Sequence, residues 1–305
     1  MIVKEEKIVL DITSDMEDER IDKVLAQCMD TLSRSFLQKL LKEGKIFVNG
    51  NVVKPNYKVK ENDRVEFEIP PAVEPEIVAE DIPLSVLYED DDVLVVNKPK
   101  GMVVHPAAGH YSGTLVNAVM FHCKDNLSGI NGVLRPGIVH RIDMDTTGSI
   151  IICKNDLSHN EIAQQLKEHS ITRRYRAIVC GVVKEDEGTI SAPIGRDKKD
   201  RKKMAVTADG KEAVTHFRVI QRFREHTYIE CELETGRTHQ IRVHMSSKGY
   251  PLLGDEVYGR GKSKYKCQGQ CLHAMTLGFN HPVSKEYIET NAPLPEYFTH
   301  LLDVL

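Results

Sequence analysis

The most informative segment of this chain is HRIDMDTTG, residues 140–148. It lies between two strongly apolar segments, GIVH and SIIIC, and both segments predict buried strands. A carboxylate next to buried strands is costly unless it is paired or used in chemistry. Asp143 is therefore the first candidate for a catalytic group, although an Asp can also cap a turn.

The composition is that of an ordinary globular protein. Its 305 residues favour about two domains, and 41% hydrophobic with 28% charged residues excludes a long disordered chain. No apolar run approaches the roughly 20 residues that cross a bilayer, and the N-terminus lacks an apolar signal core. The 7 cysteines are irregularly spaced, which indicates free thiols in a reducing compartment. We therefore expect a cytoplasmic protein with no membrane partner.

The net charge of −4 hides a local pattern. Basic residues gather in three stretches, at residues 173–176, 196–203 and 259–266. A localised basic patch binds phosphate whatever the total charge of the protein. One such stretch alone could be a solvated loop, but three of them favour a polyanionic partner.

Residues 18–69 predict a compact first unit of helices followed by strands. Apolar residues recur at helical spacing from Ile21 and again from Phe36. An Asn-Gly pair at Asn49 and Gly50 predicts a tight turn between two short strands. The prolines between residues 70 and 83 then predict a semi-rigid linker, with an edge loop of one continuous domain as the alternative.

From residue 84 onward the chain predicts strands mixed with a few helices. Regular βαβ alternation is missing, which favours an α+β domain with a largely antiparallel mixed sheet. We therefore expect an N-terminal extension at 1–17, a module and linker at 18–78, and a larger domain at 79–305.

Polar residues gather in three clusters at the ends of predicted strands. The clusters are Arg141 with Asp143, Tyr175 within TRRYRAIVCG, and ETGRTHQIRVHM with Arg237, His239, Arg242 and His244. Together they supply a carboxylate, an aromatic ring and guanidinium groups. The sequence has no phosphate-binding loop, dinucleotide fingerprint, GxSxG or HExxH motif. The cysteines and histidine at 267–273 do not complete a zinc set, so we expect neither a metal ion nor a redox cofactor.

HRIDMDTTG resembles the HRLDxxTSG signature of the RluA/RluD-type pseudouridine synthases. Further blocks match in family order over roughly residues 84–295: NKPKGMVVHPAAGH, GTLVNAV, RRYRAIVCG, ETGRTHQIRVHM, LLGDEVYG and LHAMTLGF. One departure is Ile142, where the family often has Leu, and it exchanges apolar for apolar. The resemblance implies a pseudouridine synthase catalytic domain that isomerises specific uridines to pseudouridine in large-subunit (23S) rRNA, with an essential aspartate and no cofactor.

The resemblance also implies roles for five residues. Asp143 would be the catalytic aspartate, acting on the sugar either as a nucleophile or as a base, and Arg237 would be its ion partner. Tyr175 would lie against the flipped base, Arg141 would fill the gap left in the stack, and Ile241 would line the uracil pocket. By residue type alone, Tyr175 could instead be core packing and Arg237 a phosphate contact.

Other polar residues of these blocks are interpreted as structural. The histidines His140, His239 and His244 are expected to be structural or RNA-facing rather than general bases. Asp145 is expected to have a structural role in its turn, and Asp255 and Tyr258 are expected to fix the loop GDEVYG.

Residues 18–69 are similar to the alpha-L RNA-binding module, which is named after a small-subunit ribosomal protein. The similarity lies in RIDKVLAQ, LSRSFLQKLLKEGKIFVNG and VVKPNYKVKENDRVEF. It implies a small N-terminal α/β RNA-binding module with a contact face at Arg20, Ser33, Arg34, Lys39 and Lys45. These residues would contact phosphates, giving salt-dependent affinity with little sequence readout; a solvated helix surface is the alternative.

The leading hypothesis is an RNA pseudouridine synthase that acts as a monomer in rRNA processing and ribosome biogenesis, with rRNA or ribosomal assembly particles as partners. One alternative is a catalytically silent ribosome-assembly RNA-binding protein, against which the set Asp143, Tyr175 and Arg237 argues. Another is a nucleoside hydrolase or glycosidase, which would usually need a second acid or a metal.

Overall fold

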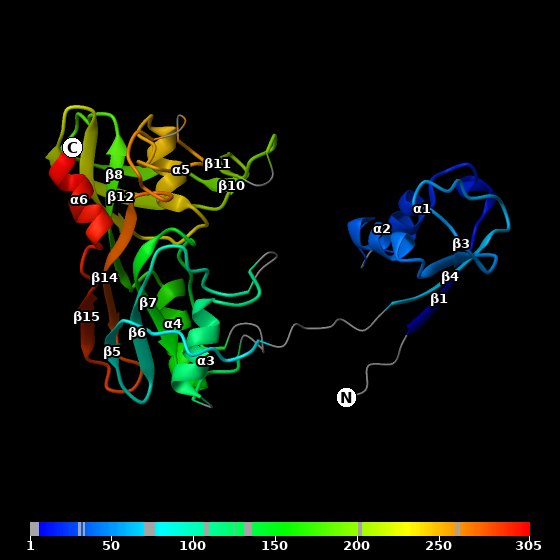
Figure 1. Ribbon diagram of the computed structural model, residues 1–305, viewed down its shortest axis with the longest axis horizontal. Coiled ribbons are helices and arrows are strands. Elements are labelled where there is room, and N and C mark those ends of the chain that lie inside the picture. The colour runs from blue at the N-terminus through cyan, green and yellow to red at the C-terminus, as the bar shows by residue number, and fades with distance from the viewer. Residues whose placement is uncertain are drawn as a thin grey trace. The chain divides into compact units, whose positions relative to one another are not determined.

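The computed structural model describes residues 6–29, 32, 34–69, 77–106, 110–124, 126–130, 136–200, 203–259, 261 and 263–305. The chain divides into two compact units, Met1–Glu74 and Pro75–Leu305 (Figure 1). Each unit has its own hydrophobic core. Among the described residues, the structure contains no helix that is both long and apolar enough to cross a membrane.

The first unit packs its helices against a small antiparallel sheet (Figure 1). Its elements are β1 (Glu6–Asp11), a 3-10 turn (Ser14–Met16), α1 (Ile21–Cys28), α2 (Arg34–Lys42), β2 (Ile46–Val48), β3 (Asn51–Val52) and β4 (Arg64–Ile69). Over the described residues the sheet order is β1-β4-β2-β3. The Asn-Gly prediction is confirmed, because Asn49 and Gly50 both have positive φ, at 49° and 76°, between β2 and β3.

The N-terminal segment differs from the sequence-based expectation. Residues 6–11 were expected to belong to an extension, but they form β1 and pair with β4 from Glu6 opposite Ile69 to Asp11 opposite Arg64. The stretch KIVLD was too short and too mixed in charge to be recognised as a strand. Pairing with β4 satisfies its backbone groups, so this segment is part of the first unit's sheet.

The second unit is built on a large mixed sheet. Its strands are β5 (Val86–Glu89), β6 (Val93–Lys98), β7 (Thr147–Cys153), β8 (Thr172–Cys180), β9 (Glu187–Ser191), β12 (Val214–Arg222), β13 (His226–Leu233), β14 (Leu272–Asn280) and β15 (Tyr287–Asn291). In the described part of the chain the order is β5-β6-β7-β14-β8-β13-β12-β9, with β15 also pairing β14. Only β7 and β14 run parallel there, which confirms the largely antiparallel α+β fold.

Helices cover both faces of this sheet. They are α3 (Leu115–Cys123), α4 (Asp156–Lys167), α5 (Gln240–Ser247) and α6 (Glu296–Val304). Leu94 and Ile150 point to the face that holds α3 and α5, whereas Val95 and Ile151 point to the face that holds α4. The alternation follows from the two-residue period of a strand. A separate hairpin, β10 (Ile194–Arg196) and β11 (Met204–Val206), contacts α5.

The glycine of HRIDMDTTG has a clear structural reason. Gly148 lies in β7 with a φ of 109°, and a Cβ there would come within 2.2 Å of the Ala274 carbonyl oxygen on β14. Glycine is therefore required for the parallel approach of β7 and β14. The preceding loop, with Asp143, is thereby held at the start of β7 in the middle of the sheet (Figure 1).

Two local predictions were wrong. The segment GIVH is not a regular strand: Ile138 makes a single antiparallel bridge to Ile152, and His140 accepts a hydrogen bond from the Ile151 N–H through its ring Nε2. The expected linker also ends early, because α3 binds its last residues. The side-chain amide of Asn117 donates to the Val78 carbonyl, and the backbone carbonyl of Asn117 accepts the Glu80 N–H. In GIVH, a hydrogen bond to the His140 side chain and one bridge replace the strand pairing that the apolar residues suggested. In the linker, contacts with α3 fix residues that the prolines had suggested were outside the domain.

Candidate active site

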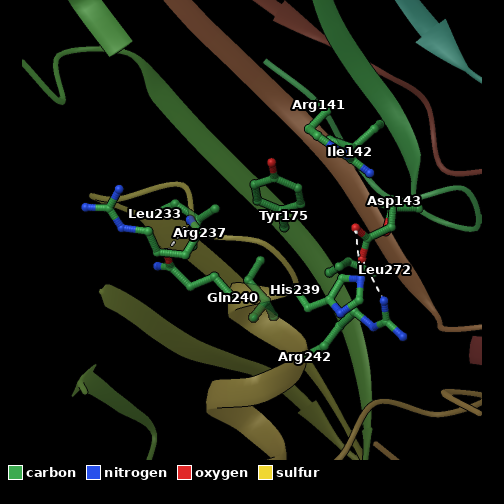
Figure 2. Close-up of a pocket in the computed structure, with 12 residues that line it drawn as sticks. Arg141, Ile142, Asp143, Tyr175, Leu233, Arg237, His239, Gln240, Arg242 and Leu272 are labelled. Carbon is green, nitrogen blue, oxygen red and sulfur yellow. Dashed lines mark hydrogen bonds and ion pairs between the residues drawn. The ribbon is translucent and has the colours of Figure 1, made fainter. Parts of the chain in front are cut away.

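A pocket opens at the point where the HRIDMDTTG loop, β8 and the start of α5 meet (Figure 2). It is lined by Arg141, Ile142, Asp143, Thr146, Tyr175, Leu233, Arg237, His239, Gln240, Ile241, Arg242 and Leu272. The candidates Asp143, Arg141, Tyr175, Arg237 and Ile241 are thus all brought together, although they come from segments far apart in sequence. The pocket combines apolar walls with one carboxylate and several guanidinium groups.

Asp143 points its side chain into this pocket rather than into its own turn. Its backbone carbonyl closes the turn by accepting the Thr146 N–H at 3.0 Å. Its carboxylate Oδ2 accepts a hydrogen bond from Nη1 of Arg242 at 2.8 Å. The side chain is therefore held by an ion pair and does not serve as a turn cap.

Arg242 is fixed on its other side by Asp255. Its Nε and Nη2 donate to the two oxygens of Asp255 at 2.7 and 2.9 Å, a bidentate pair. Only 5% of Arg242 and 2% of Asp255 are exposed. Burial would lower the pKa of Arg242, but the two carboxylates raise it above its ordinary value. Burial would likewise raise the pKa of Asp255, and the hydrogen bonds from Arg242 lower it.

The prediction that Arg237 pairs with Asp143 was wrong. Arg237 donates from Nε to the Glu212 carbonyl at 2.8 Å, and its guanidinium points away from Asp143 (Figure 2). Arg237 precedes α5, whereas Arg242 lies in the first turn of the helix on the face towards the HRIDMDTTG loop. Both arginines belong to GRTHQIR, and spacing alone could not tell which of them would face the carboxylate.

Tyr175 and Ile241 form an apolar wall of the pocket with Leu233 and Leu272. Tyr175 lies on β8 and is 8% exposed, and burial raises the pKa of its hydroxyl. That hydroxyl makes no hydrogen bond to any residue described here, and it points away from α5 (Figure 2). A wall of this kind suits a flat heteroaromatic ring.

Arg141 lies at the mouth of the pocket and is exposed. Within the described parts of the chain its guanidinium has no hydrogen-bond or ion-pair partner. A second hollow is lined in part by the same residues, Arg141, Asp143, His239 and Arg242. Arg141 is thus free to contact a ligand that enters either hollow.

The three histidines have different roles. His140 accepts a backbone hydrogen bond from Ile151, and burial lowers its pKa to about 3. His244 is buried between Thr215 and the Ala192 carbonyl. These two are structural, as expected. His239 instead brings its Nε2 to 3.6 Å from Oδ1 of Asp143.

Asp145 lies in the turn that precedes β7, and its structural role stays a prediction. The Asp145 carboxylate packs against Gly269: a Cβ added at Gly269 would lie 2.5 Å from Oδ2 of Asp145. The carboxylate makes no hydrogen bond or ion pair to a described residue. Burial raises its pKa, opposed by Lys100 and Lys98. Asp255, in contrast, fixes its loop as expected, since it accepts the N–H groups of Val257 and Tyr258.

Sequence reasoning missed Lys98. Its side chain is fully buried at the end of β6, and its Nζ donates to the carbonyls of Pro99, Met102 and Met144 at 2.9, 2.8 and 2.9 Å. Burial lowers its pKa to about 7. Met144 follows Asp143 directly, so Lys98 supports the loop from behind. A lysine at the end of an apolar strand, in NKPKG, was the available signal.

The candidate RNA contacts of the first unit lie in or beside its helices: Arg20 precedes α1, Arg34 and Lys39 lie in α2, and Lys45 follows α2. Ser33 lies outside the described residues. Arg20 and Arg34 both bond to the buried carboxylate of Asp22, while roughly half of each arginine side chain stays exposed. Lys39 and Lys45 lie near Glu43, with 71% and 51% of their side chains exposed. This surface therefore offers two partly neutralised arginines and two accessible lysines.

The mixed sheet thus presents a carboxylate–arginine pair in a pocket with one aromatic wall and three arginines, which are groups suited to a nucleotide. Comparison with known proteins agrees. Residues 92–247 match the family described as RNA pseudouridylate synthase, and residues 19–65 match the S4 domain. The chain belongs to the RNA pseudouridylate synthase family and is an isomerase with an S4 domain.

Individual relatives cover almost the whole chain. An uncharacterized RNA pseudouridine synthase, YlyB of Bacillus subtilis, is 54% identical over 97% of this chain and 98% of its own length. Ribosomal large subunit pseudouridine synthase D of Zymomonas mobilis is 47% identical over 96% of both chains. Human RNA pseudouridylate synthase domain containing 1 has the same fold, with a TM-score of 0.58, 24% identity and coverage of 71% of this chain and 86% of its own.

Proposed function

We propose that this enzyme converts specific uridines of large-subunit ribosomal RNA to pseudouridine, with Asp143 as its catalytic carboxylate. The substrate rests on relatives named for the ribosomal large subunit, 42–47% identical over most of the chain. The catalytic role rests on one observation, the Asp143–Arg242 ion pair inside the pocket of Figure 2.

The reaction breaks the bond between N1 of uracil and C1′ of ribose and joins C5 of the same base to C1′. The proton that leaves C5 is balanced by the one gained at N1, so no redox cofactor is required. Asp143 starts the exchange either by attack on C1′ or by removal of a sugar proton. Both roles need a carboxylate that is fixed in place, and Arg242 binds Oδ2 of Asp143 at 2.8 Å.

The lining of the pocket is suited to hold a detached uracil while the base turns. Tyr175 offers a flat face, and Ile241, Leu233 and Leu272 offer apolar contact. A base reaches such a pocket only after it leaves its helix or loop stack. Arg141, at the mouth, is suited to fill the space left in the RNA, and Arg237 is suited to a phosphate or base contact.

The first unit contributes affinity. Lys39 and Lys45 would contact phosphates, together with the exposed parts of Arg20 and Arg34. Ser33 is included in this proposed RNA-binding face because of the similarity to the alpha-L module. We propose a monomer as the working unit. The 7 cysteines are odd in number and irregularly spaced, which supports a reducing compartment, the cytoplasm.

Mapping pseudouridines in ribosomal RNA tests the substrate. Cells that lack this protein should lose pseudouridine at defined uridines of large-subunit rRNA, and the wild-type gene should restore them. An unchanged large-subunit map would contradict the proposed substrate. A binding protein without catalysis would leave the map unchanged in the same way, so the purified enzyme must also form pseudouridine in a large-subunit rRNA transcript.

A further inference from the structure

The two oxygens of Asp143 have different surroundings. Oδ2 is bound by Arg242 at 2.8 Å, whereas Oδ1 faces Nε2 of His239 at 3.6 Å (Figure 2). A separation of 3.6 Å is an ion-pair distance but is longer than a hydrogen bond. Because Arg242 occupies Oδ2, Oδ1 is the oxygen left for the substrate, and His239 is the protein group next to it.

His239 is held firmly in this place. It precedes α5 with φ 57° and ψ 22°, a left-handed conformation that residues other than glycine seldom adopt. Its Nδ1 lies 2.8 Å from the hydroxyl of Tyr258, and the two rings meet edge to face at 5.6 Å. The contacts with Tyr258 therefore hold the imidazole ring in place and offset the energetic cost of the left-handed backbone conformation.

Tyr258 connects three groups of the site. Its hydroxyl oxygen accepts the Met204 N–H at 3.0 Å, and its ring lies 5.1 Å below the guanidinium carbon of Arg242. Met204 begins β11, directly after the basic stretch at 196–203. A line of contacts thus runs from this hairpin through Tyr258 and His239 to Asp143.

The donors and acceptors of Met204, Tyr258 and His239 determine where the protons lie. The Tyr258 oxygen accepts from Met204 and keeps one hydrogen of its own, which it donates to Nδ1 of His239. A neutral imidazole that accepts at Nδ1 carries its proton on Nε2, towards Oδ1 of Asp143. Burial, the largest influence, lowers the pKa of His239, and Asp143 opposes that effect.

We propose that His239 and Tyr258 are positioning residues for the reaction: the Nε2–H of His239 orients Oδ1 of Asp143, and the Tyr258 hydroxyl orients His239. This inference rests on the proposed role of Asp143. His239 directs its Nε2–H towards Oδ1 across 3.6 Å, and it is not the general base. Tyr258 also supports Arg242, so it touches both partners of the carboxylate.

The test uses the full-length enzyme and a large-subunit rRNA transcript. Tyr258→Phe removes only the hydroxyl and should lower the single-turnover rate constant about tenfold, while the Kd for RNA stays unchanged. His239→Ala should lose at least as much, and His239→Gln, which can present an amide N–H near the position of Nε2, should recover part of the rate. Tyr287→Phe, an exposed hydroxyl on β15, is the matched control.

The double variant separates positioning from a general structural role. If Tyr258 acts through His239, adding Tyr258→Phe to His239→Ala should cost little more than His239→Ala alone. Losses that multiply, a wild-type rate in Tyr258→Phe, or a defect confined to the Kd would each overturn the proposal. If wild-type enzyme leaves the transcript unmodified, the proposed substrate fails instead. Carbon NMR of the Asp143 carboxyl then decides the inference: a shift in both single variants supports it, and an unchanged signal overturns it.

Discussion

Arg242 binds Asp143 with one nitrogen at 2.8 Å and Asp255 with the other two at 2.7 and 2.9 Å. A single planar guanidinium therefore joins the candidate catalytic carboxylate to a buried anchor. Because Asp255 fixes the plane of Arg242, the position of its free edge, and hence of Asp143, is fixed as well. Lysine has the charge of arginine but cannot reproduce this fork.

The first prediction concerns this pair. Arg242→Lys should lower the single-turnover rate constant by roughly a hundredfold or more, because the donor that holds Asp143 is lost while the charge is kept. Arg242→Gln should lose at least as much. The RNA Kd should change far less than the rate in both variants.

Arg237→Gln is the matched control, since it changes an arginine of the same motif that donates to Glu212 rather than to Asp143. It should affect the Kd for RNA more than the rate constant. The opposite ranking, with Arg237 essential for the rate and Arg242 dispensable, would contradict the assignment of the ion pair.

The second prediction concerns pH and the first unit. Burial alone would raise the pKa of Asp22, but hydrogen bonds from Arg20, Gln38 and Arg34 lower it to about 2. A carboxyl whose pKa is depressed on folding stabilises the protein above its unfolded pKa and loses that effect as the pH falls through the folded value. The contribution should be at most about 2 kcal/mol, present above roughly pH 4 and lost between pH 4 and pH 2.

Amide hydrogen exchange in α1 and α2 of the full-length protein measures this contribution. The free energy of opening should be higher in wild type than in Asp22→Asn near neutral pH. The difference should shrink towards zero as the pH approaches 2. A difference that stays constant across this range would mean that Asp22 is not the titrating group.

The third prediction concerns RNA affinity. Lys39→Gln combined with Lys45→Gln should weaken binding to all RNA sequences alike and should reduce the slope of log K against log salt by roughly 1 to 2. The single-turnover rate at saturating enzyme should stay near that of wild type.

Filter binding over a range of salt concentrations measures that slope. A charge-matched control, Lys167→Gln with Lys285→Gln in the second unit, should leave the slope unchanged. Equal effects of the two double variants would show that the first unit provides no specific phosphate contacts.

Most residues of the site could be predicted from the sequence, but the ion partner of Asp143 could not. Asp143, Tyr175 and Ile241 could be placed together because family blocks carry each of them, and the structure brings them into one pocket. The partner of Asp143 could not be derived, since it depends on where α5 begins relative to GRTHQIR. Arg237 and Arg242 are five residues apart, about 1.4 helical turns, so they face different directions, and no local pattern shows which of them faces Asp143.

Other features were hidden because they depend on contacts between distant segments. Lys98 is buried by three carbonyls from its own strand end and from the HRIDMDTTG loop, which apolar patterning does not predict. Strand β1 is stabilised by β4, nearly sixty residues later, rather than by its own short sequence. The helix α6 and the strands β9, β10, β11 and β15 were not predicted, because their patterns are short or irregular.

The proposed catalytic role of Asp143 is tested by a single isosteric variant. Asp143→Asn keeps the size of the side chain and can still contact Arg242, so RNA binding should stay close to wild type. Removal of a nucleophile or base should lower pseudouridine formation by roughly a thousandfold or more. The measurement is single-turnover pseudouridine formation in a large-subunit rRNA transcript, with RNA Kd determined in parallel. Product below detection with an unchanged Kd is the predicted result, and product at the wild-type rate would contradict the account.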